Sequence, residues 1–324
     1  MATEILLSPP PNGDTVLWRY MPDENFYPLL VAQSGIDDWA ELPGTFPAAT
    51  ISLPSLGSFR LSLPKAFSDE HEGTFPALNS SNITYCANAG VLLGVPPAEQ
   101  LQRAESFCER NPAELRDRVQ TTALLHGVSC WTTKCDESLH MWNSFARRKD
   151  GVVRGVAIRT TCRKLREAVV LPSLHSPVQE GKVRLTVNCP KTDFDRLLFE
   201  IVTVTYVDLD RDFLLPDGAR NLLRLKGREH YVDESEVRCI GLSPALASLY
   251  RKRLFCSDPS LDELKDALKN VSSSRRGYCL PIKLQHAIEE IRTFPAGDTS
   301  FFEDVSARTA AKGIRPALVH PSVF

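Results

Sequence analysis

The sequence predicts an α+β fold with a mixed, largely antiparallel sheet flanked by helices. Runs of β-branched and aromatic residues alternate along the chain with segments whose apolar residues recur at helical spacing. The composition is that of an ordinary globular protein, with 43% hydrophobic and 24% charged residues among 324. We expect a loose, proline-rich leader at residues 1–14 and a single domain at residues 15–324.

Strands are expected where four or more consecutive positions favour an extended chain and turn residues bound the run. Val16 to Met21 is the clearest run, and Pro64 ends the second one because proline cannot donate to a strand ladder. The expected strands are residues 15–21, 59–64, 128–132, 152–158, 182–188, 199–207, 231–240 and 317–320.

Helices are expected where caps and apolar spacing agree. Asn111-Pro112 starts a helix inside a helical insertion at about residues 97–125, Ser260 and Glu263 form a capping box, and Gly313 ends the last helix. The segments rich in proline, glycine, serine or charge, residues 34–58 and 67–73, are expected to be loops. The expected helices are residues 23–33, 97–125, 138–146, 219–226, 243–254, 261–270, 284–293 and 300–312.

Charge and cysteine content narrow the setting. A net charge of −2 gives no signal for nucleic acid or for acidic membranes, and no apolar run reaches the roughly 20 residues that span a bilayer. The N-terminus lacks a secretory signal. The nine scattered cysteines contain no C-x-x-C, which predicts free thiols in the cytoplasm, no disulfide and no structural zinc site.

The run at residues 231–240 concentrates charge within an otherwise apolar strand. Alternate residues of a strand share a face, so Glu234, Glu236 and Arg238 are expected on one face and Val237 and Cys239 on the other. Two neighbouring carboxylates repel each other, so a cation, a metal ion or a ligand must compensate them. The structural alternative is a solvated strand face.

Four blocks of the chain, in order, resemble the bacterial family called domain of unknown function twenty-nine seventy-one. They are Leu17–Tyr20, Leu61–Glu72, Ser129–Val152 with its Met141-Trp142 pair, and Tyr231–Arg238. The chain departs from the family pattern at Glu70, Phe145, Tyr231 and Asp233. The resemblance covers about residues 15–320 and implies no settled activity, so function has to be inferred from the site.

A second pattern is similar to the R-S-E class of ADP-ribosyltransferases: Arg19 on a first strand, Ser62 on a second, and Glu234-x-Glu236 on a late strand. This resemblance implies an NAD-consuming enzyme, a transferase or a glycohydrolase, with a toxin or defence role. The acceptor of a transferred group stays open, and so does the place of any metal, for which no motif is present.

In such an enzyme Glu236 would stabilise the positive charge that builds on the ribose as the nicotinamide bond breaks. Glu234 would orient or deprotonate the attacking group, Arg19 would bind the pyrophosphate or a ribose hydroxyl, and Ser62 would hydrogen-bond the ribose or the carboxylate. The aromatic candidates for stacking on NAD are Tyr20, Trp142 and Tyr231, and the supporting charged residues are Asp69, Glu72 and Arg238.

Each candidate also has a structural interpretation. Arg19 would pair with Asp69 or Glu72, Ser62 would be an ordinary strand residue, and Trp142 would pack in the core. Two other functions are open as well. One is a magnesium- or manganese-dependent phosphoesterase or nuclease built on acidic residues and one histidine, namely Asp69, Glu70, His71, Glu72, Glu234 and Glu236.

The other is a non-catalytic nucleotide-sensing or protein-interaction module, in which the polar cluster is a structural network. The enzyme hypotheses predict that Arg19, Ser62 and Glu236 converge on one deep cleft. The interaction hypothesis predicts a filled site and an exposed apolar patch elsewhere.

Overall fold

A computed structural model describes most of the chain. The described residues are 3–4, 6–33, 37–39, 42, 46, 55–67, 74, 112–134, 137–172, 198–210, 212–213, 219–228, 234–252, 259–272 and 277–324. Within them, no helix combines the length and the apolar composition that crossing a bilayer requires.

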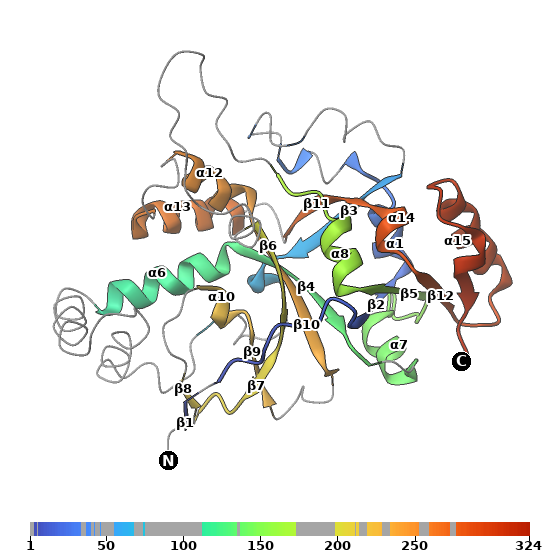
Figure 1. Cartoon of the computed structure of the whole chain (residues 1–324), viewed down its shortest axis with the longest axis horizontal. Helices are drawn as coiled ribbons and strands as arrows, with labels where there is room; N and C mark the ends of the chain where they lie inside the picture. Colours follow the sequence, from blue (N-terminus) through green and yellow to red (C-terminus); the bar gives the residue numbers. More distant parts are fainter. Residues whose placement is uncertain are drawn as a thin grey trace, which may run out of the picture.

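The fold is α+β and is organised around a nine-stranded sheet, as the sequence predicts (Figure 1). Its pairs are antiparallel except for β12 with β13. Its strands are β2 (Val16–Pro22), β3 (Leu56–Ser62), β4 (His126–Thr132), β5 (Gly155–Thr161), β6 (Phe199–Thr203), β10 (Glu236–Leu242), β11 (Gly277–Lys283), β12 (Glu290–Phe294) and β13 (Val319–Pro321). Two small sheets pair β1 (Thr3–Glu4) with β8 (Asp212–Phe213) and β7 (Thr205–Val207) with β9 (Leu225–Gly227).

Strand β4 is the branching point of this sheet. On one edge it pairs along its whole length with β10, which in turn pairs with β6. On the other edge it meets two arms through one bridge each: Trp18–Thr132 leads to β2, β5, β12 and β13, and Ser62–Val128 leads to β3 and β11. We call this pair of single bridges the seam.

Helices cover both faces of the sheet, and Figure 1 shows α6, α12 and α13 grouped at one end of the molecule and α15 at the other. The helices are α1 (Asp23–Leu29), α6 (Pro112–Leu124), α7 (Leu139–Phe145), α8 (Cys162–Ala168), α10 (Ala219–Leu222), α12 (Pro244–Lys252), α13 (Leu261–Ser272), α14 (Leu284–Ala287) and α15 (Thr299–Ala310), with 3-10 turns η1 (Pro64–Ala66) and η4 (Pro316–Leu318). Local signals explain their ends: Ser260 Oγ accepts from the Glu263 backbone N–H, while the Glu263 carboxylate accepts from the Ser260 N–H, a complete capping box.

The core lies on both faces of the sheet. The largest cluster fills one face and includes Leu17, Trp131, Val237 and Cys239. The opposite face carries a cluster around Val128 and Ile240, packed under α6 and α10, and a cluster around Trp18, packed under α7. The structural alternative for the central strand, one solvated face, is wrong, because every residue of β10 is buried.

Several local predictions are corrected by the structure. Residues 284–293 form the short α14 followed by strand β12 instead of one amphipathic helix. Residues 219–226 form the short α10 and the first part of β9. The strand expected at 152–158 starts at Gly155, and helix α8 and strand β11 were not expected at all. Tertiary pairing decides these segments, since their apolar spacing fits both structures.

The cysteines that the structure describes, Cys130, Cys162, Cys239 and Cys279, are free thiols. The other five lie outside the described residues.

Candidate functional site

The charged residues at the start of β10 form a buried ion-pair network. Glu236 is only 4% exposed. Its Oε1 accepts from Arg238 Nε at 2.8 Å and its Oε2 from Lys226 Nζ at 2.8 Å, and the same ammonium group donates to Glu234 Oε2 at 2.6 Å. The Arg238 guanidinium also donates to the Leu223 carbonyl at 2.7 Å. Two cations and two carboxylates therefore neutralise one another inside the protein.

These neighbours fix the protonation of Glu236. Burial disfavours its charged form, but the charges and hydrogen bonds of Arg238 and Lys226 outweigh burial and lower the pKa of the carboxyl to about 2. The Lys226 ammonium is also costly to bury, yet the two glutamates raise its pKa. The network is thus ionised at neutral pH, and both carboxylate oxygens of Glu236 already have partners.

Glu234 does not extend the strand, contrary to the sequence prediction. The strand starts at Glu236, and Ser235 before it has a φ of 48°, in the left-handed region that breaks strand alternation. Glu234 reaches the network from outside the strand because Lys226 of β9 bridges the two carboxylates. The Glu234 carbonyl also accepts from Thr132 Oγ1 at 2.7 Å, which holds this turn against the end of β4.

The predicted convergence of Arg19, Ser62 and Glu236 on one cleft is wrong. Directly paired residues share a face, and Trp18 pairs with Thr132, which pairs with Glu236. Arg19 follows Trp18, so its side chain lies on the opposite face of the sheet from Glu236.

Ser62 is on the face of Glu236, but its partner Val128 is four residues from Thr132 along β4, roughly 13 Å at the usual strand rise. It therefore cannot reach the carboxylate directly.

Arg19 bridges the seam through aromatic contacts. Its guanidinium carbon lies 5.9 Å from the ring centre of Phe59 in β3 and 5.8 Å from that of Trp131 in β4. Burial lowers the pKa of this arginine. Within the described part of the chain no acidic side chain pairs with it, and the two ring faces contribute cation–π stabilisation.

The aromatic candidates Tyr20 and Trp142 pack against each other rather than facing an opening. Their ring centres are 4.8 Å apart in an edge-to-face arrangement, and Trp142 is fully buried. Trp142 Nε1 donates to Glu137 Oε1 at 2.8 Å, and Arg292 Nη1 donates to Glu137 Oε2 at 2.6 Å. Burial raises the pKa of Tyr20 to about 12. Sequence reasoning missed Glu137, the residue that organises this cluster.

Three further candidates, Asp69, Glu72 and Tyr231, lie outside the described residues, as do Glu70 and His71 of the metal hypothesis. Among the described residues, no group of three or more histidines, cysteines or acidic residues is arranged to hold a metal ion. Glu234 and Glu236, the described members of the proposed metal set, are occupied by Lys226 and, for Glu236, Arg238.

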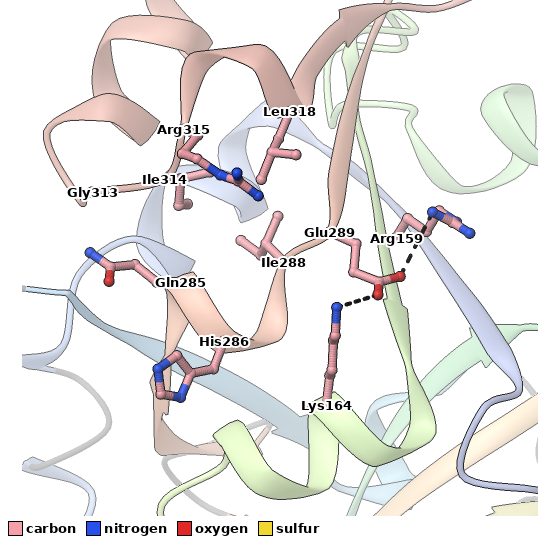
Figure 2. Close-up of a pocket in the computed structure, with 10 residues that line it drawn as sticks. All are labelled: Arg159, Lys164, Gln285, His286, Ile288, Glu289, Gly313, Ile314, Arg315 and Leu318. Atoms are coloured by element: carbon pink, nitrogen blue, oxygen red, sulfur yellow. Dashed lines mark hydrogen bonds and ion pairs between the residues drawn. The ribbon is translucent and has the colours of Figure 1, made fainter.

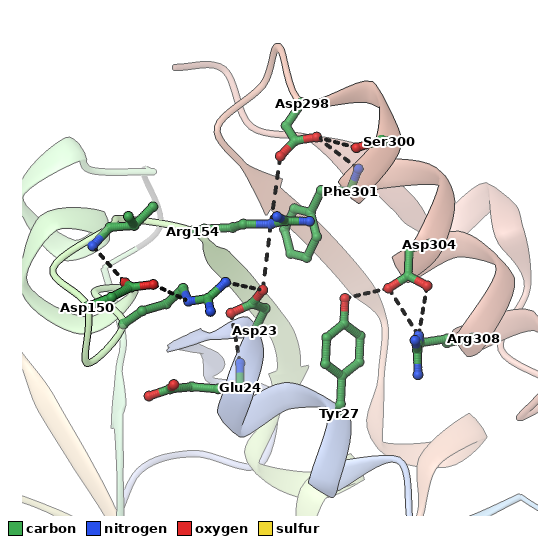
Figure 3. A network of polar contacts seen from close by, with 12 residues as sticks. Asp23, Glu24, Tyr27, Asp150, Arg154, Asp298, Ser300, Phe301, Asp304 and Arg308 are labelled. Carbon is green, nitrogen blue, oxygen red and sulfur yellow. Dashed lines mark hydrogen bonds and ion pairs between the residues drawn. The ribbon is translucent and has the colours of Figure 1, made fainter.

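A second polar network joins α1 to α15 (Figure 3). Asp23 receives Arg148 and Arg154, the Arg154 guanidinium lies 4.4 Å from the ring centre of Phe301, and Tyr27 Oη donates to Asp304. These contacts compensate the Asp23 and Asp304 charges near the interface between the two helices. We interpret this network as structural, because it holds the ends of two distant segments together.

A pocket of about 530 Å³ lies between α8, α14 and the chain that follows α15 (Figure 2). Four segments line it: β5 and α8, the turn from α14 to β12, and the chain that leaves α15. The lining residues are Arg159, Lys164, Gln285, His286, Ile288, Glu289, Gly313, Ile314, Arg315 and Leu318. We call this cavity the basic pocket, because three lysine or arginine side chains and one carboxylate are among its lining residues.

The geometry of the basic pocket follows from its elements. Gly313 has a φ of 74°, which lets the chain turn sharply after α15 and bring Arg315 to the rim. The Glu289 N–H donates to the Arg159 carbonyl at 2.9 Å, so the turn after α14 is fixed on β5. Lys164 Nζ is 2.5 Å from Glu289 Oε1, and Arg159 Nη1 is 3.7 Å from Oε2. Ile288, Ile314 and Leu318 supply an apolar wall.

None of the residues that line the basic pocket was a candidate from the sequence. Lys164 lies in a helix that was not expected, and residues 284–293 were predicted as one helix, which would scatter Gln285 and Glu289 around its circumference. The one local signal, the glycine at the end of α15, predicts a turn but no binding.

Comparison with family models, curated proteins and solved structures finds no match for this chain. The resemblances to domain of unknown function twenty-nine seventy-one and to the ADP-ribosyltransferases therefore stay predictions. Function has to be inferred from the geometry alone.

Proposed function

We propose that this protein binds a phosphate-bearing small molecule of nucleotide size in the basic pocket, as a nucleotide-sensing module. The observation that carries the proposal is the combination of volume and lining. A cavity of about 530 Å³ falls in the usual range for small-molecule sites, and it places Arg159, Lys164 and Arg315 around one space.

The chemistry of the walls supports this ligand class. Guanidinium and ammonium groups are the side chains that bind phosphate best, and arginine adds a planar pair of donors. The apolar wall of Ile288, Ile314 and Leu318 suits a flat, weakly polar group such as a nucleobase. A ligand with an anionic end and an apolar end matches both walls at once.

Titration calorimetry at low salt tests the proposal. The ligands are AMP, ATP, NAD and inorganic phosphate, and the variants are Arg315→Ala and, as a matched control, Lys149→Ala, an exposed cation of the turn after α7. We expect nucleotide binding that Arg315→Ala weakens by about tenfold to a hundredfold, the effect of losing one charge-assisted hydrogen bond. The control should bind like wild type. Absence of nucleotide binding, or equal binding by Arg315→Ala, would reject the proposal.

The NAD-consuming enzyme is a second candidate. The observation in its favour is that Glu236 stays ionised, since a carboxylate must be charged to stabilise the cationic transition state. The burial of Glu236 and its two ion pairs weigh against it, because Lys226 and Arg238 would have to release the carboxylate before a ribose could reach it.

Nicotinamide release from NAD, followed by mass spectrometry in cell lysate, tests this second candidate. Loss of release by two to three orders of magnitude in Glu236→Gln, with the fold intact by circular dichroism, would favour the enzyme. No release by wild type, or equal release by both proteins, would remove Glu236 from any such mechanism. Magnesium-dependent cleavage of nucleic acid would instead favour the phosphoesterase.

A further inference from the structure

Glu289 is the one carboxylate among the residues that line the basic pocket, and its position is fixed. Its side chain is 18% exposed, and its backbone N–H is bonded to Arg159 of β5. Lys164 holds Oε1 at 2.5 Å, whereas Arg159 approaches Oε2 only to 3.7 Å, which is longer than a hydrogen bond. Oε2 therefore keeps room to accept a hydrogen bond from a ligand.

A carboxylate in a pocket of cations imposes an orientation on the ligand. A phosphate group placed beside Glu289 would meet a like charge, but a hydroxyl group would find an acceptor. Figure 2 shows the Arg315 side chain reaching over Ile288, while Glu289 lies beside Lys164 and Arg159. The phosphate is therefore favoured at the Arg315 side of the pocket, and hydroxyl groups are favoured at Glu289.

A ribose carries the two neighbouring hydroxyl groups that such a carboxylate accepts, and an acidic residue on ribose hydroxyls is a recurrent arrangement in nucleotide sites. The apolar wall then receives the base. We propose that the basic pocket selects ribonucleotides, with Glu289 reading the ribose hydroxyl groups. This inference rests on the proposed function, because it names the ligand class of the same site.

The test compares AMP with 2′,3′-dideoxy-AMP by titration calorimetry, on wild type and on Glu289→Gln. Glu167→Gln is the matched control, because Glu167 is an exposed carboxylate of α8, the helix that carries Lys164, and does not line the pocket. We expect wild type to bind AMP at least tenfold more tightly than the dideoxy analogue. Glu289→Gln should lose about tenfold for AMP and little for the analogue, so the two effects are coupled. The control should keep the wild-type preference.

The sign of the Glu289→Gln effect separates this role from a purely electrostatic one. If Glu289 only repels anions, its neutralisation should tighten the binding of AMP and of the analogue alike. If it only holds Lys164 in place, its neutralisation should weaken the binding of both alike. Either result would overturn the inference. Equal affinity of wild type for AMP and the analogue would overturn it too, while leaving nucleotide binding intact. Failure of wild type to bind either compound would instead reject the proposed function. Melting temperatures of all variants serve as the check on folding.

Discussion

At the start of β10, the carboxylate of Glu236 is 4% exposed and has ion-pair partners on both oxygens, whereas Glu289 in the basic pocket is 18% exposed and has a hydrogen-bonding cation on one oxygen only. Both glutamates lie among lysine and arginine side chains. The charges around Glu236 pair with one another, whereas those around Glu289 line a cavity of about 530 Å³.

The difference shows how burial limits what a charge can do. A carboxylate removed from water is stable only if its partners replace the lost hydration, and those partners then occupy the positions that a ligand would need. A carboxylate at the wall of an open pocket keeps water on one side, so a ligand can exchange with that water. Dense charge in a strand therefore points first to stability and only then to chemistry.

The largest effect is expected from replacing Lys226. In Lys226→Met the buried Glu236 carboxylate and the partly exposed Glu234 carboxylate lose their shared partner, and breaking a buried pair usually costs about 3–5 kcal/mol. Urea denaturation should show that loss in the free energy of unfolding. Lys149→Met, an exposed lysine, is the control and should change it by less than about 0.5 kcal/mol. An unchanged midpoint for Lys226→Met would mean that the network is dispensable.

Acid should also destabilise the fold through His126, which lies at the opposite end of the β4–β10 pair from Glu236. Its Nδ1 donates to the Thr122 carbonyl at 2.8 Å and its Nε2 accepts from Arg220 Nε at 3.3 Å, so both nitrogens fit the neutral ring. Burial and the Arg220 charge lower the pKa of His126 to about 3, against 6.5 in the unfolded chain. Its contribution to stability is therefore complete above pH 6.5 and is lost as the pH falls toward 3.

Unfolding free energies measured between pH 7 and pH 4 should thus decrease by a few kcal/mol in wild type. In His126→Gln, which cannot titrate, the slope over the same range should be clearly smaller. Glu236 adds its own loss only below about pH 4.5, because its pKa is lowered from that value to about 2. Identical slopes in the two proteins would show that His126 is not the acid-sensitive group.

Arg19 tests how much two aromatic ring faces contribute to holding a half-buried cation. Replacing it by methionine keeps an apolar chain of similar length but removes the contacts with Phe59 and Trp131, worth about 1–2 kcal/mol together. Thermal unfolding of Arg19→Met should report that loss, and Arg19→Lys should be intermediate. A variant more stable than wild type would mean that the burial of the charge costs more than the rings return.

The smallest effect is expected in the basic pocket. Lys164 and Glu289 are partly exposed, and such ion pairs contribute about 0–1 kcal/mol. Lys164→Ala should leave the melting temperature within a degree or two while it weakens nucleotide binding. A loss of stability comparable to that of Lys226→Met would mean that the ion pair in the basic pocket is as important for stability as the buried network around Glu236.

Local signals in the sequence predict much of the fold. Alternation identifies β2 and β4, the Ser260–Glu263 box starts α13, and Gly313 marks the end of α15. They fail where pairing decides, as at β12, whose strand is completed by Ile158 and Val319 from distant segments. Proximity in sequence identified Glu236 and Arg238 as partners, but it could not place Arg19 on the other face of the sheet.

The basic pocket could not be predicted for the same reason. The lining residues come from two stretches, 159–164 and 285–318, that are more than one hundred residues apart in the sequence. Helix α8 was not expected, and α14 and β12 were predicted as one helix. No short motif joins the two stretches, so only the folded chain brings their charges together.

At the seam, two parts of the sheet are each joined to β4 by a single bridge. A single bridge is not a continuous ladder of hydrogen bonds. We therefore expect the part formed by β3 and β11 and the part formed by β2, β5, β12 and β13 to open as separate cooperative units. Backbone amide exchange would then report two opening free energies within one continuous sheet. Arg19 in β2 contacts both Phe59 in β3 and Trp131 in β4, so its side chain links the two parts across the seam.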